Sequence, residues 1–357
     1  MEVEDNHSEL LIDKYRPKSL DELDFGKNIN NKLKALSKNL NIPHMILEGK
    51  KGSGKKLRSL LFLKEKYGDS VFKMTNRSVT YSNEVLNIFI SMYHFQFDPS
   101  IHGVYDKNLL ASFIEDNVKY KPIKLIPYKI IIIENADNLS VEAQQYLRRT
   151  LETYVSNCRF IFLVNKINKL IDPLYSRCVK IICPSPTNLE IKTILKKMIQ
   201  RMNINIIDSF LDDLIKSSER NLNLALHYLD RSIVLGLVTK KFNVYQIDDV
   251  EKTVKNIVKL LLNGKDMQIF FNENSASETI TIRKLLYDLQ VFGISPTEIL
   301  NKIFKQILLN ISRSEYLIIY KIAELTSNHD NSIRLGSKSM YHLESYVLNV
   351  FKIMNKF

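Results

Sequence analysis

Apolar residues follow one kind of spacing in the first half of this chain and another in the second half. Up to about residue 185, short uninterrupted apolar runs alternate with stretches of helical spacing. Such runs are typical of strands that are buried on both faces of a parallel sheet. The runs that predict strands span residues 45–47, 130–133, 160–164 and 179–182. The apolar residues beyond them recur at helical spacing to the end, so the pattern predicts an α/β domain followed by helical domains.

A pair of prolines sets the first domain boundary. Pro184 and Pro186 forbid the continuation of a strand or a helix where they stand. The helical spacing that follows falls into a shorter part and a longer part, which begins at Asn243. We find no repeat or low-complexity tract, and we interpret Asn272–Ala276 as a loop. We therefore expect three domains, in residues 1–185, 186–242 and 243–357.

A segment rich in glycine and lysine follows the first predicted strand and begins an amphipathic helical stretch. The order of strand, glycine loop and helix is that of a phosphate-binding P-loop, whose backbone N–H groups curl around a phosphate. Lys55 adds a positive charge at the terminal phosphates, whereas Lys56 stands where a Ser or Thr hydroxyl normally binds Mg²⁺. The loop is predicted to hold a nucleotide while lacking one normal metal ligand. The nucleotide-binding residues expected here are Gly49, Gly52, Ser53, Gly54, Lys55 and Lys56.

A second motif, Glu134-Asn135, comes directly after the isoleucine run 130–133. In a working ATPase the first acidic residue at this place holds the Mg²⁺ shell, and a Glu that follows orients and polarises the attacking water. Glu134 keeps the first role and is a candidate Mg²⁺ ligand. The amide of Asn135 can hydrogen-bond a water but cannot take its proton. Together with Lys56, this departure predicts a site that binds ATP or ADP and hydrolyses it poorly or not at all.

Several short motifs in a fixed order carry a resemblance to a known family. They are Asp13-Lys-Tyr-Arg-Pro17, the P-loop, Ala143-Gln144 with Leu147-Arg-Arg-Thr150, Ser176-Arg-Cys178, and Arg334-Leu-Gly-Ser-Lys338 with Tyr341-His-Leu-Glu344. Nearly end to end, the chain resembles the small subunits of replication factor C, the eukaryotic clamp loader of the AAA+ class. The Gly-Lys-Lys form of the loop and the last motif are most similar to one kind of small subunit. That subunit occupies the end position of the ring and resembles a degenerate ATPase.

The resemblance implies a RecA-like AAA+ P-loop domain, a small helical lid and an all-α collar that joins subunits into a ring. It also implies four other replication factor C subunits as partners in a hetero-pentamer, a sliding clamp, primer-template DNA and a place in the nucleus. We expect a clamp-loader subunit whose own ATPase site is inactive or weak. A self-contained ATP-hydrolysing AAA+ remodeller and a purely structural adaptor remain as alternatives.

The resemblance also gives roles to residues near the nucleotide. Tyr15 and Arg16 would lie over the adenine and ribose, and Asn165 would be the sensor that hydrogen-bonds the γ-phosphate or a water. In the lid, Asn223 stands where family members usually have an arginine. The lid's cationic contact to the nucleotide is therefore missing or moved, with Arg220 as a candidate.

Arginines elsewhere in the chain match motifs that act between subunits. Arg177 matches the family's arginine finger, which reaches into the active site of the next subunit. A planar, permanently charged guanidinium can bond two phosphate oxygens at once. Arg148 and Arg149 lie on a predicted helix that resembles the coupler between neighbouring subunits near the DNA channel. Contact with DNA phosphate and contact with a subunit both stay open for this pair, and a solvated pair is the common alternative.

Composition narrows the class of protein without identifying it. The chain has 51 Lys and Arg against 39 Asp and Glu, a net charge of +12, which favours polyanionic partners. No apolar run approaches the length that crosses a bilayer, and Met1–Asp5 contains no apolar segment, so we expect neither a membrane partner nor a secretory signal. The three cysteines, Cys158, Cys178 and Cys183, have neither metal-ligand spacing nor an even count, which indicates reduced thiols.

Overall fold

The computed structural model describes residues 10–81, 84–119, 127–202, 204, 206–237, 243–244, 248–263, 282–311, 315–335 and 338–354. Its internal contacts divide the chain into two compact units, residues 1–242 and 243–357. The loop expected at 272–276 lies outside the described residues. None of the described helices is long and apolar enough to cross a membrane.

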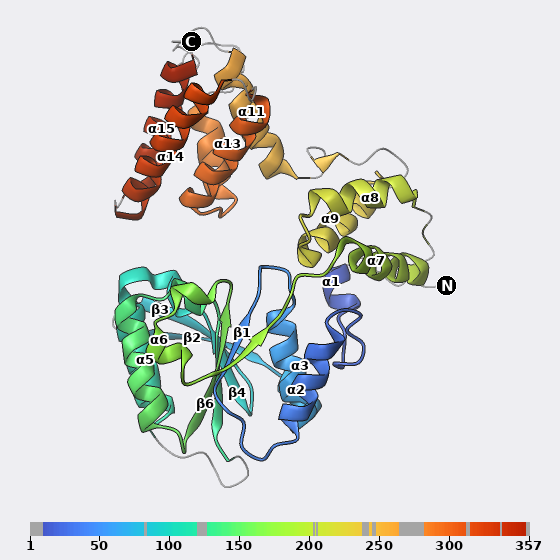
Figure 1. Ribbon diagram of the computed structural model, residues 1–357, viewed down its shortest axis with the longest axis vertical. Coiled ribbons are helices and arrows are strands. Elements are labelled where there is room, and N and C mark those ends of the chain that lie inside the picture. Colours follow the sequence, from blue (N-terminus) through green and yellow to red (C-terminus); the bar gives the residue numbers. More distant parts are fainter. Residues whose placement is uncertain are drawn as a thin grey trace. The chain divides into compact units, whose positions relative to one another are not determined.

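A seven-stranded sheet forms the centre of the first unit (Figure 1). Five neighbouring strands, in the order β4-β5-β6-β1-β7, are parallel to one another, and the antiparallel strands β3 and β2 extend the sheet beyond β4. Strand β1 therefore lies between β6 and β7, and the P-loop follows its carboxyl end. The strands are β1 Met45–Glu48, β2 Thr75–Tyr81, β3 Glu84–Ile90, β4 His94–Phe97, β5 Lys129–Ile133, β6 Cys158–Val164 and β7 Val179–Ile182.

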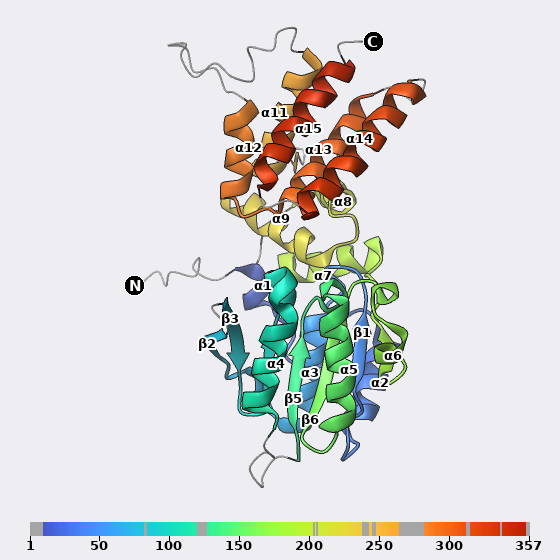
Figure 2. The same cartoon turned by 90° about the vertical axis from the view of Figure 1, so that its left-hand side faces the viewer.

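Helices cover both faces of this sheet (Figure 2). One face packs against α2 (Lys27–Ser37) and α3 (Lys55–Tyr67), and the other against α4 (Asp106–Asn117) and α5 (Val141–Thr153). Short helical segments complete the connections: η1 Asp69–Phe72, η2 Pro99–Tyr105, η3 Ala136–Asn138, η4 Ile167–Lys169 and α6 Asp172–Tyr175. The arrangement confirms the predicted α/β domain.

The isoleucine run of β5 shows why four apolar residues in succession form a central strand. Side chains alternate between the two faces of a strand. Ile131 and Ile133 pack into the core under α4 and α5, whereas Ile130 and Ile132 pack into the core under α2 and α3. Each of the four is at most 1% exposed, so both faces of the strand are buried.

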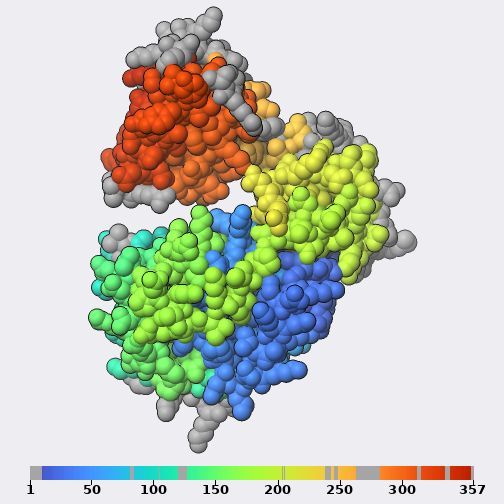
Figure 3. All heavy atoms as spheres, viewed as in Figure 1, coloured from blue at the N-terminus to red at the C-terminus, as the bar shows by residue number. Residues whose placement is uncertain are grey.

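Three further helices of the first unit lie beside the short N-terminal helix α1 (Leu11–Lys14). They are α7 Asn188–Met202, α8 Asp208–Ser217 and α9 Leu222–Val234. Helix α1 contacts α9, and Figure 3 shows the N-terminal segment in blue lying against the yellow and green surface of these helices. The apolar stripe that predicts α7, with Ile191 and Leu195 among its members, is buried. Asn221 caps α9, because its side chain accepts a hydrogen bond from the Leu224 amide.

The second unit consists, in its described part, of helices packed around one apolar core. They are α11 Asp249–Asn263, α12 Ile282–Val291, α13 Pro296–Asn310, α14 Tyr316–Leu335 and α15 Ser339–Met354. Ser295 caps α13, and the guanidinium of Arg283 donates to both carboxylate oxygens of Glu344, which ties α12 to α15. This unit confirms the predicted all-α part of the chain.

Candidate nucleotide-binding site

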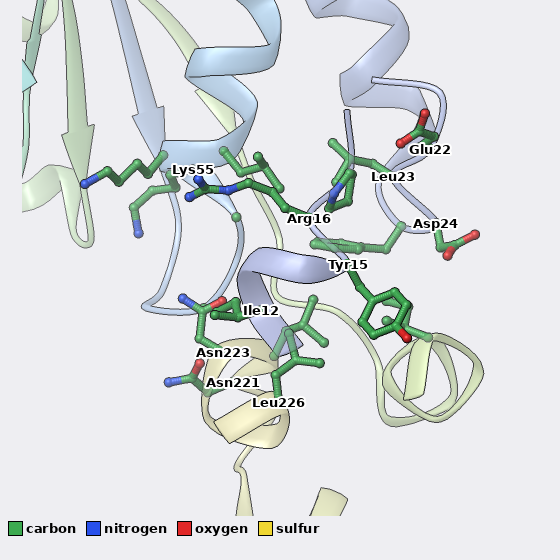
Figure 4. A pocket seen from close by; sticks show the side chains of 18 of the residues that line it. Ile12, Tyr15, Arg16, Glu22, Leu23, Asp24, Lys55, Asn221, Asn223 and Leu226 are labelled. Carbon is green, nitrogen blue, oxygen red and sulfur yellow. The ribbon is translucent and has the colours of Figure 1, made fainter. Parts of the chain in front are cut away.

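A cavity of about 700 Å³ opens in the first unit where the N-terminal segment, the P-loop and helices α7 and α9 meet (Figure 4). The predicted residues Gly49, Ser53, Arg148, Arg149 and Arg177 do not line it. The residues expected at the nucleotide that do line it are Tyr15, Arg16, Gly52, Gly54, Lys55, Lys56, Glu134, Asn135 and Asn165. Motifs separated by as many as 150 positions in the sequence are thus gathered around one cavity.

Close approach of neighbouring groups requires glycine at two positions of the P-loop. Gly52 has a φ of 79°, in the left-handed region, and a Cβ built there would lie 2.0 Å from Asn221 Oδ1. A Cβ on Gly49 would lie 2.2 Å from the carbonyl oxygen of Cys183. The loop is therefore pressed between the start of α9 and the strand end that precedes the proline pair. Ser53, between Gly52 and Gly54, is fully buried.

The ammonium group of Lys55 is held in the cavity by three oxygen acceptors. Its Nζ donates to the carbonyl oxygens of Gly49 and Lys50, the latter at 3.0 Å, and to Asn165 Oδ1 at 3.2 Å. Burial lowers the pKa of Lys55. The amide nitrogen of the Asn165 side chain in turn donates to Asp137 Oδ1 at 3.3 Å. Asn165 therefore bridges Lys55 and Asp137, a residue that the sequence analysis did not single out.

Lys56 and Glu134 form an ion pair across the cavity wall. Lys56 Nζ lies 2.9 Å from Glu134 Oε1, and Gln96 Nε2 donates to the same oxygen at 2.6 Å. The ring of Phe89, on β3, lies 5.6 Å from Lys56 Nζ, within the range of a cation–π contact. One oxygen of the carboxylate expected to face a metal shell is therefore engaged by side chains of this chain.

Asn135 is turned toward a neighbouring strand. Its backbone is left-handed, with a φ of 46°, and its Nδ2 donates to Asp98 Oδ2 at 2.5 Å. An amide that donates to a carboxylate presents no base to a water. The geometry agrees with the chemical reading of Asn135 as a residue that does not activate water.

Among the described residues, two cationic side chains of α7 lie at the cavity. Lys197 and Arg201 line the cavity, and Lys197 is paired with Asp24. The candidate suggested by sequence, Arg220, is directed elsewhere: its guanidinium donates to the carbonyl oxygens of Ser185 and Pro186, each at 3.1 Å. The sequence signal for the two cations was their i, i+4 spacing on one face of α7.

Asn221 and Asn223 project from the start of α9 toward the P-loop in Figure 4. Asn223, which stands where the family resemblance implies an arginine, therefore offers an uncharged amide to the cavity. Both Tyr15 and Arg16 line the cavity, and in Figure 4 the Arg16 side chain points toward Lys55, whereas the Tyr15 ring points away from the loop.

A buried arginine supports the P-loop from below, and the sequence analysis missed it. Arg58 is fully buried on the first turns of α3 and donates to Asn30 Oδ1 at 3.2 Å and to the Phe25 carbonyl oxygen at 3.0 Å. It also donates to the carbonyl oxygen of Ser53 inside the loop. Arg58 thereby links the P-loop to the N-terminal segment that forms the opposite wall.

The predicted arginine finger lies on the surface, away from the residues that line the cavity. Arg177 Nε donates to Glu152 Oε1 at 2.7 Å, and its Nη1 donates to the Pro173 carbonyl oxygen at 2.7 Å. Arg148 Nε lies 3.8 Å from the same Glu152 oxygen, whereas Arg149 is exposed one residue further along α5. These side chains form a charged surface cluster, which we call the Arg177–Glu152 cluster.

Family models match two parts of the chain. The model "Replication factor C subunit 3, C-terminal domain" matches residues 259–357. The model "DNA polymerase III, delta subunit" matches residues 26–186.

Full-length relatives are also similar to this chain. The probable replication factor C subunit 3 of Dictyostelium discoideum is 31% identical over 98% of this chain and 99% of its own length. Replication factor C subunit 5 of Schizosaccharomyces pombe is 29% identical over 96% of each chain. Among solved structures, a DNA polymerase III gamma subunit-related protein from Thermotoga maritima has a TM-score of 0.50 and 11% identity, over 91% of this chain and 99% of that one. That likeness concerns the fold alone, and it agrees with the predicted RecA-like domain followed by helices.

Proposed function

This chain belongs to the replication factor C family of clamp-loader subunits, among those named subunit 3 or subunit 5, and we propose that it retains a nucleotide without hydrolysing it. We further propose that it serves its neighbours in a hetero-pentamer with four other replication factor C subunits. That complex would place a sliding clamp on primer-template DNA in the nucleus. We keep the division into RecA-like domain 1–185, lid 186–242 and collar 243–357 as part of this proposal.

The retention proposal rests on the hydrogen-bond partners of Asn135 and Glu134, the two residues at positions that take part in hydrolysis in a working ATPase. Hydrolysis needs a group that orients and polarises water beside the terminal phosphate. Asn135 has no base to offer and donates to Asp98 instead. Glu134 accepts from Lys56 and Gln96. The parts that bind phosphate remain, because the glycine loop, Lys55 and Asn165 all lie at one cavity.

We propose that the adenine and ribose lie between Tyr15, Arg16 and the lid, with the phosphates on the P-loop. Support comes from the size of the cavity, about 700 Å³, which falls in the range of small-molecule and cofactor sites. Lys197 and Arg201 give the lid side positive charge in place of the missing arginine at Asn223. Lid and loop would then close on one ligand and set the shape of the first unit.

We propose that Arg177 acts in trans on the nucleotide of a neighbouring subunit. It is exposed and lies outside the cavity of its own chain, so it has no ligand role there. Its guanidinium already donates through Nε and Nη2 to one carboxylate oxygen, Glu152 Oε1, and the same two nitrogens suit the bidentate binding of a phosphate. An incoming phosphate would exchange one anionic partner for another.

Arg148 and Arg149 are proposed to couple this chain to DNA phosphate or to a neighbouring subunit. Both are exposed on α5, and the net charge of +12 supports a polyanionic partner. Arg148 also faces Glu152, the partner of Arg177, so movement of α5 would reach the finger directly.

The test of retention is nucleotide binding and turnover by the purified chain, with Lys55→Ala as the comparison. We expect the wild-type chain to bind adenine nucleotide, to hydrolyse almost none, and to lose binding in Lys55→Ala. Robust hydrolysis that Lys55→Ala abolishes would identify a self-contained remodeller instead. Absence of nucleotide binding would identify a structural adaptor. Co-purification of four relatives and a clamp with the tagged native chain would test the assembly.

A further inference from the structure

The fold family implies Mg²⁺ at the phosphates, and the residues of this chain can be tested against that ion. In P-loop NTPases the ion is held by the Ser or Thr hydroxyl at the end of the loop and by the acidic residue after the second strand motif. The equivalent positions here are Lys56 and Glu134. An ammonium has three donors and no acceptor, so Lys56 cannot be a metal ligand.

Glu134, at the second of these positions, already has hydrogen-bond donors within this chain. Glu134 Oε1 accepts from Lys56 Nζ at 2.9 Å and from Gln96 Nε2 at 2.6 Å. Two donors therefore converge on the carboxylate oxygen, and one of them carries the charge that a metal would otherwise bring. Phe89, on β3, faces the same ammonium at 5.6 Å, so Lys56 contacts both Glu134 and an aromatic ring.

No alternative metal ligands replace these two in the described part of the chain, where no group of three or more His, Cys, Asp or Glu is placed to hold an ion. The other carboxylates near the cavity have partners of their own. Among those that line the cavity, Asp21 is paired with Lys34, Glu22 accepts from the Lys18 amide, and Asp24 is paired with Lys197. Asp98 and Asp137, which lie behind Asn135 and Asn165, accept from those two residues. The site does not fit Mg²⁺.

The two neighbouring lysines are directed to different places, so each can play a separate part. Lys55 Nζ lies among the loop carbonyl oxygens and Asn165, as the P-loop lysine should. Lys56 Nζ lies at Glu134, beside the position where the ion would bridge the phosphates. An ammonium at that position supplies a fixed positive charge and hydrogen-bond donors to phosphate oxygens.

We propose that this site binds its adenine nucleotide without Mg²⁺, with the ammonium of Lys56 standing in for the metal. The proposal rests on the proposed function, because it assumes that the cavity holds a nucleotide. The proposal gives one explanation for two departures from a working ATPase, Lys56 and Asn135, which otherwise look like independent losses. A chain that never hydrolyses its nucleotide has no need of the ion, and a lysine in its place keeps the charge without the chemistry.

The test is equilibrium binding of ADP and ATP to the full chain, measured by calorimetry with excess Mg²⁺ and again with excess EDTA. For the wild-type chain we expect dissociation constants that agree within about threefold, well under the tenfold that marks 1.4 kcal/mol. Dissociation constants more than about tenfold weaker in EDTA would overturn the proposal while leaving nucleotide retention intact. Absence of binding under both conditions would overturn the proposed function, and this proposal with it.

Lys56→Thr restores the hydroxyl and releases Glu134. The affinity of this variant for nucleotide should therefore depend on Mg²⁺. We expect Mg²⁺ to strengthen ADP binding by this variant about tenfold or more, and Lys56→Thr/Glu134→Gln to lose that gain. The matched control is Lys51→Thr, the same replacement at another lysine of the loop, which should weaken binding equally with Mg²⁺ and with EDTA. Mn²⁺ binding followed by electron paramagnetic resonance gives a second readout. Nucleotide-dependent Mn²⁺ binding should appear in Lys56→Thr, and its presence in the wild-type chain would contradict the proposal.

Discussion

The guanidinium of Arg177 is held by the carboxylate of Glu152, with Nε 2.7 Å and Nη2 2.5 Å from the same Oε1 atom. The pair joins the loop after α6 to the last turn of α5, and neither residue lines the nucleotide cavity. A fork that already binds one anion at the surface is ready to bind another, such as a phosphate on a neighbouring subunit. Because of this relationship, the proposed role of Arg177 as an arginine finger can be tested without disturbing the chain's own site.

We expect Arg177→Ala to lower the DNA- and clamp-stimulated ATP hydrolysis of an intact complex, with assembly and nucleotide retention by this chain unchanged. For the one site that Arg177 serves, the loss should be on the order of 10³ to 10⁵ in rate. The total rate of ATP hydrolysis by the complex would fall by the fraction that this one site contributes. The fall would be larger if the sites hydrolyse ATP in a fixed sequence. Arg177→Lys should rescue poorly, because a point charge lacks the bidentate fork. Steady-state hydrolysis by a complex carrying only this substitution is the measurement.

Glu152→Gln is the matched control for the finger. It removes the carboxylate charge but leaves Arg177, and an exposed ion pair contributes about 1 kcal/mol or less to stability. Hydrolysis should therefore stay at the wild-type rate or rise, since Arg177 is released for its target. A complex in which Arg177→Ala turns over normally, or in which both variants lose the same activity, would remove the trans-acting role.

One added methyl group can break the contact between the P-loop and the start of α9. A Cβ on Gly52 would lie 2.0 Å from Asn221 Oδ1, in a backbone with a φ of 79°. We expect Gly52→Ala to abolish nucleotide binding, because either the loop or the start of α9 must move. The control is Gly293→Ala, where φ is 75° but nothing lies within 4 Å of the added Cβ. That variant should lose only about 1–2 kcal/mol of stability and keep its nucleotide affinity. Equal effects of the two on affinity would argue against a direct contact.

Binding of the assembled complex to primer-template DNA should fall steeply as salt rises and should not depend on base sequence. Contacts from a basic surface to phosphates release counterions and carry no sequence information. If Arg149 contacts a phosphate, Arg149→Ala should reduce the slope of log affinity against log salt by about 1. An unchanged slope combined with weaker subunit assembly would assign the residue to a subunit contact instead.

Two histidines, the buried His94 and the half-buried His44, give the first unit a defined response to acid. Burial lowers the pKa of His94 to about 4, and burial together with the charge of Arg159 lowers the pKa of His44 to about 4. Between about pH 6.5 and about pH 4 the unfolded chain binds these protons and the folded chain does not. As the pH is lowered through this window, the free energy of unfolding should therefore decrease by up to about 1.4 kcal/mol per pH unit for each histidine.

Urea unfolding followed by circular dichroism at several pH values tests this response. His94→Gln should remove the contribution of one histidine and make the fall less steep, even though loss of the contact to Ser91 lowers stability at every pH. A free energy of unfolding that stays constant from pH 6.5 to pH 4 would contradict the assignment.

The positions of several residues of the candidate nucleotide-binding site could be predicted from the local sequence. The strand runs before the P-loop and before Glu134 were long and apolar enough to predict, and parallel strands bring their carboxyl ends to one edge. Lys55, Glu134 and Asn165 therefore gather where the sequence analysis expected them. Their binding roles remain predictions, but their positions required only the order of strand and loop.

A hydrogen-bond partner of each of Glu134 and Asn135 could not be predicted from the sequence, because both partners lie on or directly after a strand that the apolar pattern does not reveal. Strand β4 carries polar Gln96 between two phenylalanines and is short, so nothing marked it as the neighbour of β5. The pairing of β4 with β5 is what brings Gln96 to Glu134, and Asp98, just past the end of β4, to Asn135. Arg58 was hidden for another reason: an arginine on an amphipathic helix is usually solvated, and only the fold shows that it is buried.

The most direct test of the account follows one nucleotide through many cycles of the complex. A reconstituted complex would be built with this chain loaded beforehand with ATP labelled at both the α- and the γ-phosphate, and free label would be removed. Clamp loading would then be driven by unlabelled ATP and DNA, and the label on this chain would be counted after re-isolation. We expect both labels to stay bound in an unchanged ratio while the complex turns over. Loss of the γ label at the rate of turnover, with the α label retained as ADP, would show that this site hydrolyses its nucleotide and would contradict the account.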